Sequence, residues 1–212
     1  MDTLYDFFLS PYAEATWQDI LLEVTAVIFG LLSVLFARKG NIWVYPTGII
    51  STMIYVYICY MVRYYGDLII NIYYTMMSVY GWILWANISE DSSLKITWCK
   101  AKDWAIALAI TILSMVFVVG VYIYFDKFES WLNYVDVLTT GLAFGSMWLM
   151  AKKKVENWLG WLLTDLISVP LYFAKGLGFT GIQFTIFLIL AWQGYQIWKK
   201  EANEGREKRK TI

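Results

Sequence analysis

Seven apolar stretches divide this chain of 212 residues. A bilayer core of about 30 Å takes about 20 helical residues to cross, and each stretch is close to that length. The runs are continuously apolar rather than alternating, which favours membrane helices over barrel strands. The predicted spans are residues 20–37, 42–62, 68–87, 104–125, 133–151, 158–174 and 179–198. The pattern therefore predicts an all-α integral membrane protein.

The spans fall into a triplet, a single span and a second triplet, and the triplets resemble each other. The matches are Glu23 with Asp136 and Gly81 with Gly194, at a numbering offset of 113, and Ser51 with Ser168 and Tyr55 with Tyr172, at a numbering offset of 117. The single span restores the chain direction, so both triplets start from the same side. We predict parallel three-helix repeats at 20–87 and 133–198 with a linker helix at 104–125, a transporter architecture. A duplicated structural protein is the alternative.

Charge predicts the orientation of these spans. The spans take up most of the chain, which is 59% hydrophobic, so few residues remain for a separate soluble domain and the charges lie mainly in the loops and at the two ends. Basic loops stay in the cytoplasm, which places the amino terminus outside and the carboxyl terminus inside. The side assigned to the cytoplasm holds Arg38, Lys39, Lys95, Lys100, Lys102, Lys152, Lys153, Lys154, Lys199, Lys200, Arg206, Lys208, Arg209 and Lys210, and the other side only Arg63, Lys127 and Lys175.

The same assignment describes the two ends of the chain. Residues 1–19 become a short acidic extracytoplasmic segment, and residues 199–212 a basic cytoplasmic tail. Nucleic-acid binding by the tail is an alternative, but a solvated stop signal after a span explains its charge more simply. We therefore expect a lipid bilayer and no nucleic acid as partner.

Polar residues inside the spans form two stripes with spacings of three and four, which place each stripe on one helix face. The sixth span carries Trp158, Trp161, Asp165, Ser168 and Tyr172, and the third carries Asp67, Asn71, Tyr74, Ser78 and Trp85. A carboxylate at the bilayer centre costs about 3 kcal/mol even on the insertion scale, so both stripes should face a cavity.

Several of these residues also have structural explanations. Trp158 lies at a span boundary, where an aromatic-belt anchor would fit, whereas Trp161 and Asp165 are too deep for that role. The amides of Asn71 and Gln183 could join helices through hydrogen bonds. Pro46 and Pro170 each remove a backbone hydrogen bond and are candidate hinges or tolerated kinks.

The missing residue types narrow the chemistry. The chain has no histidine and two cysteines, Cys59 within a span and Cys99 in a loop, so we predict no metal site, no cofactor and no catalytic residues. No phosphate-binding GxxxxGK[ST] motif is present in the sequence. An integral-membrane enzyme would need a paired acid and base at depth, and Asp165 has no evident titratable partner in the sequence.

The same approach describes the solute. No lysine or arginine lies inside a predicted span, so nothing there would neutralise a phosphate, and the solute should be neutral or cationic. Tryptophan suits a flat cationic ring, with a desolvated cation–π contact worth about 2 kcal/mol. Asp165 would supply a counter-charge, and Asn71, Gln183 and Ser168 could bind hydroxyl groups.

Three segments of the chain carry a resemblance to a known family: Trp43 to Ser51 with Pro46 and Gly48, Asn71 to Tyr74 followed by Tyr80-Gly81-Trp82, and Lys153 to Trp161 running on to Asp165, Ser168 and Leu171-Tyr172. On these segments, along nearly its whole length, the chain resembles the PnuC family of bacterial vitamin transporters. The family's WxxW motif falls on Trp158 and Trp161, and its NxxY motif on Asn71 and Tyr74. Both motifs are associated with substrate binding in the family, and we add Thr47 and Ser51 of the first segment as expected substrate contacts.

The resemblance implies uptake of nicotinamide riboside by facilitated diffusion, trapping of the product by cytosolic phosphorylation, and a homotrimer in the bacterial inner membrane. Its helix order is similar to that of the SWEET sugar carriers. Relatives carry thiamine or riboflavin, and thiamine, also a cationic ring with a hydroxyl, is the closest alternative substrate. Whether transport is ion-coupled stays open, with Asp165 the candidate proton carrier.

Overall fold

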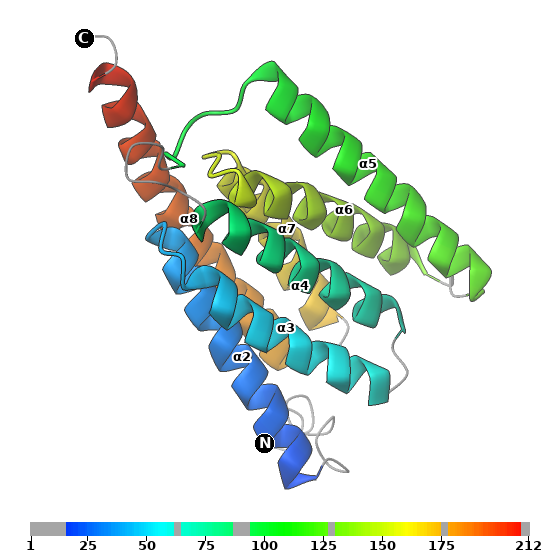
Figure 1. Ribbon diagram of the computed structural model, residues 1–212. Coiled ribbons are helices and arrows are strands. Elements are labelled where there is room, and N and C mark those ends of the chain that lie inside the picture. The colour runs from blue at the N-terminus through cyan, green and yellow to red at the C-terminus, as the bar shows by residue number, and fades with distance from the viewer. Residues whose placement is uncertain (1–15, 62–64, 87–93, 127–129, 175–177, 209–212) are drawn as a thin grey trace.

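The computed structural model describes residues 16–61, 65–86, 94–126, 130–174 and 178–208. Within these ranges the chain forms seven α-helices, the number that the sequence predicts. This confirms the all-α class (Figure 1). They are α2 (Trp17–Arg38), α3 (Val44–Met61), α4 (Tyr65–Ala86), α5 (Ala101–Tyr124), α6 (Trp131–Ala151), α7 (Asn157–Ala174) and α8 (Gly178–Lys208). The predicted acidic segment up to residue 15 lies outside the described residues, as do Arg63, Lys127, Lys175, Arg209 and Lys210.

The helix boundaries differ from the predicted spans at both ends of the chain. α2 begins earlier, at Trp17, because Thr16 and Asp19 form a capping box in which each side chain accepts a hydrogen bond from the backbone N–H of the other. α8 continues to Lys208, so the predicted tail is helical over its first ten residues, 199–208. Among the described helices, α2, α3, α4 and α5 are long and apolar enough to cross a membrane.

The helices pack in two groups of three. α3 lies between α2 and α4, and α7 lies between α6 and α8. The groups meet where α2 contacts α8 and where α4 contacts α6, while α5 packs against α6 on the outside of the bundle (Figure 1). Exchanging α2 with α6, α3 with α7 and α4 with α8 leaves the contacts within and between the two groups unchanged, and only the packing of α5 on α6 breaks this symmetry. We call the end of the bundle that carries Lys39, Lys152 and Lys199 the basic end.

The turn that joins the first two helices is repeated between α6 and α7. Gly40 and Lys153 both have a left-handed backbone, with φ of 62° and 51°. The hydrogen bonds also correspond: Gly40 N to Ala37 O and Lys153 N to Met150 O, Asn41 N to Phe36 O and Lys154 N to Leu149 O, and Val44 N to Asn41 O and Asn157 N to Lys154 O, all between 2.9 and 3.1 Å. Every matched atom pair has the same numbering offset, 113.

This constant offset corrects the alignment of the middle helices. α3 begins at Val44 and α7 at Asn157, again at the numbering offset of 113, so Ser51 corresponds to Thr164 and Thr52 to Asp165. The predicted offset of 117 for Ser51 with Ser168 was wrong by one helical turn. A slip of four residues keeps the same helix face, so polar residues still match polar residues.

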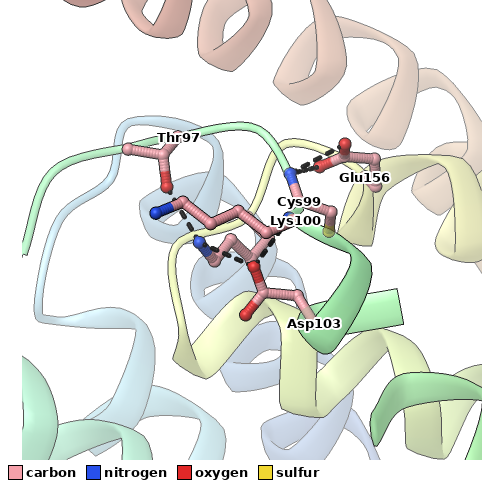
Figure 2. A network of polar contacts seen from close by, with 6 residues as sticks. Thr97, Cys99, Lys100, Asp103 and Glu156 are labelled. Carbon is pink, nitrogen blue, oxygen red and sulfur yellow. Dashed lines mark hydrogen bonds and ion pairs between the residues drawn. The ribbon is translucent and has the colours of Figure 1, made fainter. Parts of the chain in front are cut away.

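The segment before α5 closes the basic end of the second group. Thr97 and Lys154 form an isolated parallel bridge, and the Glu156 carboxylate accepts a hydrogen bond from Cys99 N at 2.9 Å. Lys154 Nζ lies 3.1 Å from the Asp103 carboxylate and also donates to Thr97 Oγ1 (Figure 2). Burial, followed by the adjacent Glu156, raises the pKa of the Cys99 thiol, so the thiol stays protonated near neutral pH.

Candidate functional site

A cavity of about 1740 Å³ lies between the helices and is lined by side chains from α2 through α8. Nine of the ten predicted substrate contacts line it: Ser51, Asn71, Tyr74, Trp158, Trp161, Asp165, Ser168, Tyr172 and Gln183. The lining runs from Ile20 and Asp136 to Ala37, Met150 and Ala191, which lie toward the basic end. The fold therefore brings residues from α3, α4, α7 and α8 to one space.

Asp165 of α7 is the charged group deepest in this arrangement. Only 4% of its surface is exposed, and no described residue donates a hydrogen bond to its carboxylate or forms an ion pair with it. A buried carboxylate without such partners is costly unless a proton or a cation neutralises it. The site is thus incomplete in a way that a cationic ligand would correct.

Aromatic rings form the wall beside Asp165. The rings of Tyr74 on α4 and Trp161 on α7 lie with centroids 6.5 Å apart and planes tilted by 48°. Tyr73 stacks on Phe144 of α6 at 3.7 Å, and its hydroxyl donates to the carbonyl of Phe144 at 3.0 Å. These contacts hold the α4 rings in place, so the wall is a preformed surface for a flat ring.

Amide and hydroxyl groups supply further polar contacts. Asn71 donates through Nδ2 to the carbonyl of Asp67 at 2.9 Å, which fixes the amide while its oxygen remains an acceptor. Gln183 lies next to Tyr55 across the cavity between α8 and α3. Tyr172 stacks on Phe184 with ring centroids 4.8 Å apart. The Asn71 amide is therefore bonded within α4, whereas Gln183 links α8 to α3, and both side chains also line the cavity.

Trp158 and Thr47 have mainly structural surroundings. Trp158 is 2% exposed and meets Trp198 edge to face at 5.6 Å, so it forms the floor of the cavity at the basic end rather than a side wall. Trp158 is thus surrounded by buried protein. An aromatic-belt anchor would face the bilayer interface, and an open substrate contact would expose its ring to the cavity. Thr47 is absent from the described lining, and its hydroxyl donates to the carbonyl of Trp43 at 2.7 Å.

The two prolines differ in their helical position. Pro46 is the third residue of α3, where a backbone N–H has no partner within the helix, so it removes no helical hydrogen bond. The physical reason for a hinge at Pro46 therefore does not apply. Pro170 lies inside α7 and cannot donate to the carbonyl of Leu166. The argument for a flexible point holds for Pro170.

Thr164 is a polar lining residue that the sequence analysis did not select. Thr164 is 4% exposed, borders the cavity, and its hydroxyl has no hydrogen-bond partner in the described part of the chain. It lies next to Asp165, off the spacing that selected the stripe. The signal that identifies it is the numbering offset of 113, which places it opposite the buried Ser51.

Among the described residues that line the cavity, none is a lysine or an arginine. Burial among apolar and aromatic groups without a basic side chain disfavours an anionic ligand, since an unpaired buried charge is costly. The walls combine four acidic groups, indole and phenol rings, and neutral hydrogen-bonding groups, and the acidic residues are Glu23, Asp67, Asp136 and Asp165. A flat ring that is cationic or neutral and carries hydroxyl groups matches this chemistry.

Sequence comparison identifies the family. The chain matches the model of the nicotinamide mononucleotide transporter family over residues 20–200, which covers all but the two ends. The chain belongs to this family. That membership confirms the resemblance found in the motifs, and it makes the protein a member of a membrane transporter family rather than a family of enzymes.

Individual relatives of this transporter family support the same assignment. The chain is 26% identical over 211 residues to the nicotinamide riboside transporter PnuC of Escherichia coli (strain K12), covering 86% of this chain and 87% of the relative. It is 25% identical over 188 residues to the riboflavin/roseoflavin transporter RibM of Streptomyces davaonensis, covering 86% and 84%. The crystal structure of the vitamin B3 transporter PnuC superimposes with a TM-score of 0.66 at 22% identity, covering 96% and 87% of the chains, and shows that the fold is shared.

Proposed function

We propose that this protein imports nicotinamide riboside across the bacterial inner membrane. The observation that carries the proposal is the buried Asp165 carboxylate beside the rings of Tyr74 and Trp161, without a described partner of its own. Nicotinamide riboside has a flat cationic ring and a ribose. Its ring would stack against the aromatic wall and neutralise Asp165, while the hydroxyls would bind Asn71, Gln183 and Ser168.

The cavity favours the riboside over the mononucleotide for which the family model is named. The two ligands share the ring and the ribose and differ by a phosphate. No described lining residue carries a positive charge, and a buried phosphate normally needs one. Several relatives, including that of Escherichia coli, are named as riboside transporters.

Thiamine and riboflavin are the alternative substrates. Thiamine shares the cationic ring and hydroxyl that the carboxylate and the aromatic wall would bind. Riboflavin is favoured by the relative RibM, named as a riboflavin/roseoflavin transporter. Riboflavin is neutral, however, and would leave Asp165 without a counter-charge. We therefore rank riboflavin below both cationic vitamins.

The transport cycle that we infer is alternating access around this cavity. All seven described helices would cross the membrane in a 3+1+3 order of parallel repeats, similar to the SWEET carriers, with α5 as the linker. Two observations support this duplication: the contacts within and between the two groups stay the same when the groups are exchanged, and the turn between the first two helices is repeated between α6 and α7. Two packed repeats can rock about a central site, and Pro170 would ease bending of α7.

The orientation in the membrane is proposed from the charge distribution, and the mode of transport and the oligomeric state from the family resemblance. The basic end would face the cytoplasm, with the amino terminus outside, because lysine and arginine concentrate there. Transport would be facilitated diffusion, with cytosolic phosphorylation trapping the product. The assembly would be a homotrimer, as the resemblance implies.

Calorimetric titration of the detergent-purified protein tests the substrate. Nicotinamide riboside should bind more tightly than thiamine, and riboflavin more weakly than either. Nicotinamide mononucleotide should bind at least about 100-fold more weakly than the riboside, because an unpaired buried anion costs several kcal/mol. Equal affinity for riboside and mononucleotide would contradict the proposed site, and tighter binding of thiamine would reassign the vitamin.

A further inference from the structure

The cavity ends at the basic end on a buried aromatic cluster. Met150, Trp158 and Ala191 belong both to the cavity lining and to this cluster. Behind them lie Tyr45, Trp85 and Trp198, which belong to the cluster and not to the lining. Tyr45 and Trp198 have no exposed surface, and Trp85 is only 7% exposed. Any solute that leaves the cavity toward the basic end must therefore pass this layer.

The cluster is built from two corresponding units. In the first, Tyr45 packs on Gly81 and meets Trp85 edge to face at 4.9 Å. In the second, Trp158 packs on Gly194 and meets Trp198 edge to face at 5.6 Å. Each residue of the second unit lies at the same numbering offset, 113, from its counterpart. Both glycines are needed because an added Cβ would overlap the aromatic ring.

Among the described ring contacts, the two units meet at one pair. Trp85 and Trp198 have centroids 6.4 Å apart, with planes tilted by 43°. Trp85 comes from α4 in the first group of helices, and Trp198 from α8 in the second. The contact therefore lies between the two groups, where rocking motion would separate side chains.

The two tryptophans are held to different degrees. Trp85 donates through Nε1 to the carbonyl of Ala151 at 3.0 Å, and Lys153 Nζ lies 4.2 Å from the centre of its ring. Gly40 occupies the position that corresponds to Lys153, so Trp198 has no equivalent cation. Trp198 Nε1 is buried without a hydrogen-bond partner among the described residues.

Buried hydrogen-bond donors without partners lower the stability of the closed layer, so that it can open. The hydroxyl of Tyr45 and the indole N–H of Trp158 are also buried without partners in the described part of the protein. Such groups penalise the closed arrangement, and water would satisfy them once the layer separates. The closed layer thus combines extensive ring packing with a built-in cost, as a reversible gate requires.

We propose that the Trp85–Trp198 contact is the gate that closes the cavity toward the basic end. Trp85 belongs to the first group, whereas Ala151, Lys153 and Trp198 all belong to the second. Opening would therefore separate Trp85 from all three, and the Ala151 and Lys153 contacts strengthen the closed state. This inference rests on the proposed transport function and adds to it the residues that separate the two access states.

Cross-linking the two sides of the gate tests it. Trp85→Cys and Trp198→Cys are combined in a chain that carries Cys59→Ser and Cys99→Ser. A short bis-methanethiosulfonate reagent, which forms a reducible disulfide with each thiol and releases methanesulfinate, joins them in reconstituted vesicles. Riboside uptake should fall by about tenfold or more, because a closed gate becomes rate-limiting, and reduction should restore it. Calorimetric riboside binding should persist in the cross-linked protein. Each single-cysteine chain, treated in the same way, is the control and should keep its untreated rate.

The outcomes separate the gate from the transport function. Absence of riboside uptake and binding by the unmodified protein would overturn the proposed function itself. Uptake by the unmodified protein that survives cross-linking would overturn the gate alone. Loss of binding along with uptake would also overturn it, since the two tryptophans would then belong to the site.

A second pair of variants tests the same gate without cysteines. Gly81→Ala places a methyl group against Tyr45, which does not line the cavity, whereas Gly120→Ala on α5 meets nothing within 4 Å. Uptake by Gly81→Ala should fall by about tenfold relative to Gly120→Ala, with riboside binding equal in both, because only gate closure is disturbed. Equal uptake by the two variants would contradict the proposal.

Discussion

The two groups of helices are most alike at the basic end and most different at the cavity. In the first group, Ser51 donates to the carbonyl of Ala26 at 2.8 Å, and the hydroxyls of Thr52 and Thr75 lie 2.7 Å apart. At the corresponding positions of the second group, Thr164 and Asp165 have no described hydrogen-bond partners. The same backbone therefore holds satisfied structural contacts on one side and unsatisfied polar groups on the other.

The aromatic wall shows the same asymmetry. Gly48 of α3 corresponds to Trp161 of α7, and Asn71 and Tyr74 of α4 correspond to phenylalanines of α8. Each group thus contributes a different helix to the proposed site, α4 from the first and α7 from the second. The comparison suggests a division of labour in which repeated residues close the bundle and unrepeated residues bind the solute.

The largest effect should follow when the second group is made to resemble the first at its charged position. Asp165→Thr copies Thr52 and removes the proposed counter-charge, which should weaken riboside binding by about 3 kcal/mol, roughly two orders of magnitude in Kd. Calorimetry measures the change. Asp126→Asn, at an exposed position outside the cavity lining, is the control and should bind as the unmodified protein does. Unchanged affinity of Asp165→Thr would refute the counter-charge.

A smaller loss is expected from the aromatic wall. Trp161→Ala removes a ring that the first group lacks, and the cation–π contact is worth about 2 kcal/mol, so Kd should rise about 30-fold. The matched control is Trp192→Ala, because that ring is 55% exposed and does not line the cavity. If both alanine variants weaken binding equally, the loss reflects general destabilisation rather than ring stacking.

The smallest effects should separate stability from binding at one corresponding pair. Ser51→Ala removes a satisfied hydrogen bond and should lower the free energy of unfolding by about 1 kcal/mol without changing riboside affinity. Thr164→Val removes an unpaired hydroxyl and should do the reverse, with stability kept and affinity lowered about threefold. Denaturation and calorimetry on both variants measure the two quantities. Equal changes in stability and in riboside affinity for the two variants would contradict the proposed difference between Ser51 and Thr164.

The sequence alone predicted the helices, and nine of the ten substrate contacts that it selected line the cavity. Apolar runs locate membrane helices because the bilayer fixes their length, and the spacing of Trp161, Asp165 and Ser168 fixes one face of α7. Helix ends were less accurate, since capping by Thr16 and the continuation of α8 depend on polar residues outside the apolar runs.

The errors arose where several positions share a helix face. A slip of one turn left the repeat legible but hid the pairing of Thr164 with Ser51. Burial of Trp158 against Gly194 and Trp198 depends on the packing of α7 against α8, which periodicity does not report. The unpaired state of Asp165 likewise becomes visible only when its neighbours are placed.

The central claim, that the unrepeated residues of α4 and α7 bind the solute, is tested most directly by an experimental structure with nicotinamide riboside bound. We predict ligand density with the nicotinamide ring against Trp161 and Tyr74 and its positive charge beside the Asp165 carboxylate. Ligand density beside Ser51 and Thr52 of α3, away from Asp165, would contradict it.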